Sequence, residues 1–300
     1  MTDTISTRTG RSLASAWRAG VAAVLAVLLA AGTAACSGTG TATSSTANSG
    51  TKVRTITAVS AGAPEPFITK ASDGSLYGQN IELTKAIFAK LPQYKLVWKT
   101  ADFSAIYPGL DAGRYQMGVN NFSKTAKNKD KYLFSDPLYS APYVAVVRKD
   151  DSLKKVSSFA DLAGKRIIVP PAGLYNIVSS LETYNKKNPS KASKIVYSQA
   201  EEADAIRQVE NGTGDVYFLD GPSYYYLKDK AGIDAKRIDI GEAVESKFSA
   251  DSHAYLIFSK DQTQLRDDVN KALKQVIKDG TATTISKKWF GEDLTGSSGD

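Results

Sequence analysis

Apolar residues recur along the chain with two periods, one typical of strands and one typical of helices, and the two kinds of segment alternate. The strand pattern occurs at residues 55–59, 94–98, 115–121, 143–147, 165–170, 194–198, 215–220 and 254–258. The helical pattern occurs at residues 78–91, 103–113, 174–185, 201–212 and 261–280. Two successive blocks of this kind predict an α/β protein with two lobes and a ligand cleft between them.

The first and last predicted helices are amphipathic. The apolar face of residues 78–91 comprises Leu83, Ile87, Phe88 and Leu91. Asn80 is placed to cap the start of that helix. The stripe in residues 261–280 comprises Leu265, Val269, Leu273, Val276 and Ile277. Gly280 is a suitable residue for the C-terminal cap of the last helix.

The N-terminal segment predicts export and lipid anchoring. Arg11 and Arg18 precede the apolar run of residues 21–31, which is short for a membrane span and typical of a signal peptide. The sequence GTAAC then ends at Cys36 and resembles a bacterial lipobox, although Thr33 stands where Leu is usual. We therefore expect a signal peptide at 1–35 and a lipid on Cys36 that holds the protein at the outer face of the cytoplasmic membrane. Ordinary cleavage after Ala35 is the alternative.

Residues 36–52 lack apolar periodicity and predict a flexible tether to the folded body. The chain has 42% hydrophobic and 23% charged residues, as expected of a globular protein. Its net charge of +7 is spread among acids throughout, which fits a nucleic-acid binder poorly. Cys36 is the only cysteine, so we expect no disulfide and no thiolate metal site.

Motifs for catalysis are missing from the sequence. His253 is the only histidine, and a lone histidine before an apolar strand is typically a strand-end residue. Glu201 and Glu202 begin a predicted helix, where we expect them to complement the helix dipole and stay solvated. No nucleophile, base and oxyanion hole assemble, and no metal or cofactor is expected, so the pattern favours binding over turnover.

Five segments in order, from Pro64 to Phe290, resemble the polar amino-acid solute-binding proteins of ABC importers. They are PEPFITKASDGSLYGQNIEL, IYPGLDAGRYQMGVNNFSKTAKNKDKYLFSDPLY, FADLAGKRIIVPPAG, VENGTGDVYFLDGPSYYYL and DVNKALKQVIKDGTATTISKKWFG. The resemblance implies a monomeric protein with the two-lobed type II periplasmic-binding-protein fold and a hinge of two crossover strands. Lobe 1 would comprise 53–142 and 250–300, and lobe 2 would comprise 143–249.

The resemblance also places Asn121, Ser123 and Asn128 at the cleft. The family carries at position 128 an arginine that grips the ligand α-carboxylate, and a neutral asparagine cannot form that charged bidentate pair. The surrounding lysines are expected in a loop and short helix, mostly solvated: Lys124, Lys127, Lys129 and Lys131. Lys127 or Lys129 would replace the arginine if the loop shifted by one residue.

Two more positions bear on the ligand. Leu174 follows Gly173 where the family usually has a threonine that helps to hold the carboxylate. Asp220 matches the aspartate that accepts from the ligand ammonium, with a plain turn aspartate as the alternative. Aromatic walls are expected from Phe67, Phe103, Phe122 and Tyr175, each of which could equally be a core residue. Phe67 is preferred because it follows Pro66 in a loop.

The sequence therefore predicts a lipoprotein that captures an amino acid or amino-acid-like amine and delivers it to an ABC permease and its ATPase. Contacts from both lobes would favour the closed form. One alternative is a cyclohexadienyl-dehydratase-like enzyme on the same fold. Another is a sensor lipoprotein that presents its ligand to a membrane receptor.

Overall fold

The structure is a computed structural model that describes residues 53–125, 127–170, 176–248 and 251–295. Its helices are α1 (Gln79–Ala89), α2 (Phe103–Asp111), α3 (Asn176–Lys187), α4 (Glu202–Glu210), α5 (Gly221–Lys230), α6 (Glu242–Glu245), α7 (Thr263–Lys278) and α8 (Thr281–Phe290). Its strands are β1 (Arg54–Ser60), β2 (Thr69–Lys70), β3 (Leu76–Tyr77), β4 (Tyr94–Thr100), β5 (Met117–Phe122), β6 (Leu133–Phe134), β7 (Tyr139–Ser140), β8 (Tyr143–Val147), β9 (Lys155–Val156), β10 (Arg166–Val169), β11 (Lys194–Tyr197), β12 (Val216–Asp220), β13 (Lys236–Ile240) and β14 (His253–Phe258).

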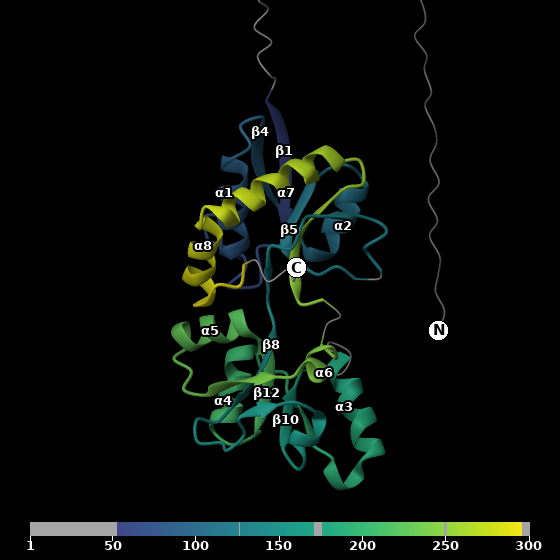
Figure 1. Cartoon of the computed structure of the whole chain (residues 1–300), viewed down its shortest axis with the longest axis vertical. Coiled ribbons are helices and arrows are strands. Elements are labelled where there is room, and N and C mark those ends of the chain that lie inside the picture. The colour runs from purple at the N-terminus through teal and green to yellow at the C-terminus, as the bar shows by residue number, and fades with distance from the viewer. Residues whose placement is uncertain (1–52, 126, 171–175, 249–250, 296–300) are drawn as a thin grey trace, which may run out of the picture. The chain divides into compact units, whose positions relative to one another are not determined.

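The strands form two main sheets, each with its own helices (Figure 1). The first has the order β4-β1-β5-β14-β6, with β7 also paired to β14, and the second has the order β11-β10-β12-β8-β13-β9. Both are mixed, because β14 runs antiparallel to β5 and β8 runs antiparallel to β12. We call the elements around these sheets lobe 1 and lobe 2. The expected α/β fold with two lobes is confirmed.

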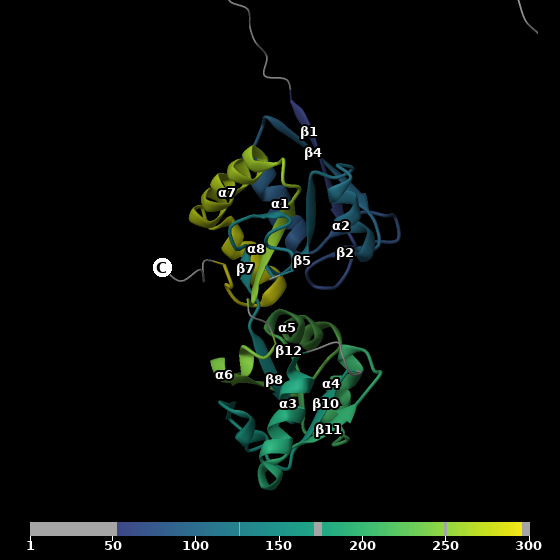
Figure 2. The same ribbon diagram turned by 90° about the vertical axis from the view of Figure 1, so that its right-hand side faces the viewer.

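Strand alternation places apolar side chains on both faces of each sheet. Ile56 and Ala58 of β1 pack with α1, α7 and α8, whereas Val59 packs with α2. Figure 2 shows α7 and α2 on opposite sides of this sheet. In β12, Phe218 packs with α3 and Leu219 with α4 and α5. Since both faces are covered, polar residues at the strand ends are the ones left to meet a ligand.

The two segments that join the sheets are bonded to each other. The chain leaves the first sheet between β7 and β8 and returns to it before β14. Strand β7 pairs with β14, and the backbone N–H of Ala141 donates to the carbonyl of Ser252 at 2.8 Å. His253 is the first residue of β14, as expected. The lobe boundaries at 142/143 and 249/250 stay a prediction, and residues 249–250 lie outside the described chain.

Two local expectations are wrong. Asn80 does not cap α1, because the residue at the N-cap position is Gly78. Glycine is required there, since φ is +114° and a Cβ would lie 2.5 Å from the Phe67 carbonyl oxygen. Asn80 lies inside the first turn, buried, and accepts from the hydroxyl of Tyr139 at 2.6 Å. The lysine-rich segment 127–131 forms turns and no helix.

No helix in the described ranges is long and apolar enough to cross a bilayer.

Candidate functional site

Two cavities lie near the carboxyl ends of β5 and β12, the edge at which open α/β sheets bind ligands. The first, which we call the cleft pocket, has a volume of about 800 Å³ and is lined by both lobes. The second, the aromatic pocket, has a volume of about 500 Å³ and lies between α2, the end of β5 and the loop that follows. Asn121 of β5 lines both cavities.

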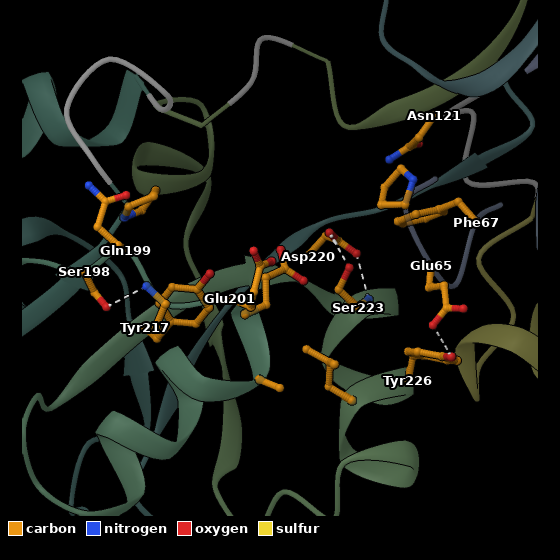
Figure 3. Close-up of a pocket in the computed structure, with 16 residues that line it drawn as sticks. Glu65, Phe67, Asn121, Ser198, Gln199, Glu201, Tyr217, Asp220, Ser223 and Tyr226 are labelled. Atoms are coloured by element: carbon orange, nitrogen blue, oxygen red, sulfur yellow. Dashed lines mark hydrogen bonds between the residues drawn. The ribbon is translucent and has the colours of Figure 1, made fainter. Parts of the chain in front are cut away.

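Asp220 ends β12, caps α5 and lines the cleft pocket (Figure 3). Its Oδ1 accepts from the backbone N–H of Ser223 at 2.8 Å, and its Oδ2 accepts from the Ser223 hydroxyl at 2.9 Å. Burial raises the pKa of Asp220, while the bonds from Ser223 oppose the rise. Each oxygen keeps a further acceptor site, so capping the helix leaves the carboxylate able to accept from an ammonium.

Glu202 corrects the expectation that the acids at the start of α4 stay solvated. Glu201 precedes the helix and is exposed, but Glu202, its first residue, is half-buried, and both line the cleft pocket. Burial raises the pKa of Glu202 to about 7, and the charges of Asp220 and Glu201 add to the rise. Because α4 starts at the ligand edge of the sheet, the Glu202 side chain lines the cavity and is partly shielded from bulk water.

A hydrogen bond joins the two lobes beside the cleft pocket. The hydroxyl of Tyr226 on α5 donates to the carboxylate of Glu65, which lies in the loop between β1 and β2 (Figure 3). Burial raises the pKa of Tyr226 to about 12, and the bond to Glu65 adds to the rise. Both residues line the cavity, so their hydrogen bond connects the lobe 1 part of the lining to the lobe 2 part.

Phe67 lines the cleft pocket, but it is a core residue with 1% of its surface exposed. Its ring stacks on Tyr139 at 6.0 Å between centroids and contacts Phe290 at 5.5 Å. Its position in a loop therefore does not keep Phe67 out of the core. The Phe67 carbonyl accepts from the backbone N–H of Asn80, which fixes the loop against α1 and turns the ring inward.

Phe103 offers the most accessible ring of the aromatic pocket. It begins α2, is 50% exposed, and stacks on Phe122 at 5.8 Å between centroids. Phe122 is buried, and Tyr107 packs edge-on against both rings. The pocket therefore has an exposed aromatic wall supported by a buried one.

Asn128 lines the aromatic pocket, and its side chain forms hydrogen bonds within its own loop. Its Oδ1 accepts from the Thr125 backbone N–H at 2.8 Å, and its Nδ2 donates to the Ser123 carbonyl at 3.1 Å. Asn121, Ser123 and Asn128 all line this pocket. The lysines of the loop are exposed: Lys124, Lys127, Lys129 and Lys131. Lys127 and Lys131 line the pocket, and Lys129 lines neither cavity.

The predicted residues thus fall into two groups. Phe67, Asn121 and Asp220 line the cleft pocket. The aromatic pocket is lined by Phe103, Asn121, Phe122, Ser123 and Asn128. Four further predicted residues lie outside the described chain, namely Cys36, Gly173, Leu174 and Tyr175.

Sequence reasoning missed Glu65, Glu202 and Tyr226 as cavity residues. A usable signal existed for Glu202. Helices that follow parallel strands begin at the ligand edge of the sheet, so an acid in the first turn faces either solvent or the cleft. Glu65 and Tyr226 gave no such signal, because their bond joins segments far apart in the sequence.

Comparisons with known proteins agree with this architecture. Residues 56–292 match the family of bacterial extracellular solute-binding proteins, family 3. The L-cystine-binding protein TcyA of Bacillus subtilis is 30% identical over 77% of this chain and 79% of its own length. The putative amino-acid ABC transporter-binding protein PatH of Vibrio harveyi is 31% identical over 77% of this chain and 86% of its own length.

A solved structure gives the same result. It comes from a study of glutathione import through GshT and the cystine ABC importer TcyBC of Streptococcus mutans. It is 31% identical, with a TM-score of 0.61, over 80% of this chain and 96% of its own. The matched relatives are binding proteins by name, in agreement with the preference for binding over catalysis. The chain belongs to the bacterial extracellular solute-binding proteins, family 3.

Proposed function

We propose that this protein, as a monomer, captures a polar amino acid or amino-acid-like amine between its lobes and delivers it to the permease and ATPase of an ABC importer. Asp220 is the observation that carries the proposal. Its carboxylate is held at the end of β12 by Ser223, lines a cavity shared by both lobes, and forms no ion pair with any described residue. A ligand ammonium would supply the missing charge, as a charge-assisted hydrogen bond.

The remaining contacts are proposed from their places in the cavities. Asn121 and Ser123 would supply polar contacts, and Phe103 would present a ring face to a cation or an apolar stem, with Phe122 behind it. Phe67 would close the cleft pocket from the lobe 1 side. Asn128 would leave the ligand carboxylate without the arginine that the family uses. Gly173, Leu174 and Tyr175 stay proposed contacts of the second lobe.

The N-terminus would keep the body near its permease. We propose that residues 1–35 are removed as a signal peptide, that Cys36 carries lipid, and that residues 36–52 act as the tether. Confinement beside the membrane raises the effective concentration of the protein at the permease without any new contact. The relatives named for cystine binding, and those named for amino-acid transport, support a zwitterion or amine as cargo.

The test begins with mass spectrometry of the small molecule that co-purifies with the protein and is released by mild denaturation. Recovery of an amine, followed by at least tenfold weaker binding of it to Asp220→Asn, is the expected result. Unchanged affinity would remove Asp220 from the site. Deleting the protein should then abolish cellular uptake of that amine, and normal uptake would point to sensing instead of import.

A further inference from the structure

The cleft pocket carries negative charge without any compensating cation. Among its described lining residues are four acids, Glu65, Glu201, Glu202 and Asp220, and no lysine or arginine. Residues 171–175 follow the lining residue Pro170 in the sequence, lie outside the described chain and carry no charged side chain. The cavity and its place between the lobes of a solute-binding protein mark the ligand site, and the acids then determine the charge of the ligand that fits.

Two of these acids already have partners and two do not. Glu65 accepts from the Tyr226 hydroxyl, and Asp220 accepts from Ser223. Glu202 forms no hydrogen bond or ion pair with any residue in the described part of the chain. Figure 3 shows Glu201 and Asp220 on the same wall, that of lobe 2. A half-buried carboxylate without a partner is costly, and a cation from the ligand removes that cost.

The mutual effect of Asp220 and Glu202 gives a second argument. The charge of Asp220 contributes to the raised pKa of Glu202, so the two carboxylates are close enough to repel each other. A single ammonium on Asp220 compensates one negative charge and leaves the other. A second cationic nitrogen would compensate Glu202, with exposed Glu201 adding to the attraction.

We propose that the cleft pocket takes a ligand with two cationic nitrogens, one bound at Asp220 and the other at Glu202. This inference rests on the proposed function and narrows its ligand class to diamines and basic amino acids. The cavity of about 800 Å³ has room for either. The α-carboxylate of a basic amino acid would turn away from the acids, toward the aromatic pocket that Lys127 and Lys131 line.

Matched ligand pairs test the proposal by titration calorimetry on the purified full-length protein after removal of co-purified ligand. Lysine is compared with norleucine, and 1,4-diaminobutane with butylamine, so that each pair differs in one cationic nitrogen. The dication of at least one pair should bind at least tenfold more tightly than its monocation. Tighter binding of lysine than of 1,4-diaminobutane would identify an amino acid as the natural ligand. Binding of 1,4-diaminobutane at least as tight as that of lysine would identify a free amine.

Variants then assign the second nitrogen to Glu202. Glu202→Gln should reduce the dication preference to less than about threefold, because it removes the partner of the second nitrogen, whereas Asp220→Asn should weaken the binding of both members of a pair. The control is Asp204→Asn, which removes an exposed acid from α4 outside the cavity lining and should preserve the preference. Measurable binding of the monocation to Glu202→Gln shows that this variant is folded.

The inference and the proposed function fail in different ways. Equal binding of dication and monocation to the unchanged protein, or a preference that persists in Glu202→Gln, overturns the inference and leaves the amine site intact. Absence of binding by all four probes, together with a co-purified ligand that has no amine, overturns the proposed function itself.

Discussion

The hydroxyl of Tyr226 in lobe 2 donates a hydrogen bond to the carboxylate of Glu65 in lobe 1. The ion pair between Arg237 and Glu292 at 2.6 Å is a second interlobe link, and α5 also contacts α8. The lobes are therefore in direct side-chain contact. The Tyr226 bond is the one that lines the cleft pocket.

Tyr226→Phe should widen the average separation of the lobes in the ligand-free protein, because it removes one interlobe bond without changing the ring. Small-angle scattering should show a larger radius of gyration than for the unchanged protein, and saturating ligand should remove the difference. Tyr197→Phe is the control, since the Tyr197 hydroxyl bonds to Glu182 within lobe 2. Identical ligand-free scattering for Tyr226→Phe would show that this bond does not hold the lobes.

Asp220 has a capping role that can be separated from its charge. Asp220→Asn keeps an acceptor for Ser223, whereas Asp220→Ala removes it, and both variants lack the negative charge. The alanine variant should therefore be less stable than the asparagine variant by about 1 kcal/mol in urea unfolding. Equal stability would mean that the side-chain cap contributes nothing to α5.

The stability of the ligand-free protein should fall as pH rises through the range in which Glu202 ionises. Its pKa is about 7 in the folded state against an ordinary 4.5, so the folded state binds more protons than the unfolded state between these values. Glu202→Gln should therefore be more stable than the unchanged protein at pH 8, by roughly 1–3 kcal/mol, and about equal to it at pH 4. Urea unfolding at both pH values measures this.

Asp204→Asn serves as the control for that pH series, because Asp204 is exposed on the same helix and pairs with Arg207. It should show no comparable gain at pH 8. A Glu202→Gln variant that is less stable than the unchanged protein at pH 8 would contradict the assignment of an unpaired, half-buried charge.

The stabilisation of lobe 2 by Asp215 should depend on pH in the opposite direction to the effect of Glu202, and should be lost at low pH. Hydrogen bonds from Arg166 and Arg148 hold the pKa of Asp215 far below its usual range, despite its burial. Its contribution is present above the ordinary aspartate range and is lost as pH falls through the folded-state pKa. Asp215→Asn should lower the free energy of unfolding by roughly 2–4 kcal/mol at pH 7, and by less at pH 3.

The matched control is Asp150→Asn. The Asp150 side chain is 87% exposed and lies 3.6 Å from Arg148, so its removal should cost less than about 1 kcal/mol. Equal losses of unfolding free energy in Asp215→Asn and Asp150→Asn would show that the hydrogen bonds around Asp215 stabilise the fold no more than an exposed ion pair does.

Asn128→Arg should restore a cation at the position where the family grips the α-carboxylate. Binding of simple α-amino acids such as alanine should improve at least tenfold, because a bidentate charged pair replaces a neutral amide. The melting temperature should fall slightly, since the bonds from Asn128 to Thr125 and Ser123 are lost. Lys129→Arg is the control, because Lys129 lies in the same turn and lines neither cavity. Loss of all binding in Asn128→Arg would contradict this interpretation.

The sequence predicted the parts of the fold in which apolar period and propensity agree. The strands that the pattern predicted and α7 fall within a residue or two of their expected bounds, whereas β13 was not predicted. Helices α5 and α8 were not assigned, because GPSYYYLKDK has no apolar stripe and TATTISKKWF is rich in β-branched residues. Their helical state depends on tertiary contacts, since α5 contacts α8 and α8 contacts α1 and α7.

The same distinction holds for the site. Asp220 could be placed at the cavity because it matches an aspartate of the family and the strand that precedes it has a clear pattern. For Glu202 the sequence left two places open, solvent or the cleft, and gave no reason to choose the cleft, because an acid at the start of a helix is also favourable in water. The core packing of Phe67 could not be predicted, because a loop position says nothing about the backbone bond that holds this loop against α1.

Asn121 is the one residue shared by the described linings of the two cavities. We therefore expect the size of this side chain to determine whether a solute in one cavity can extend into the other. Enlarging or trimming that side chain would change the maximum length of the cargo without altering any charge in the cleft.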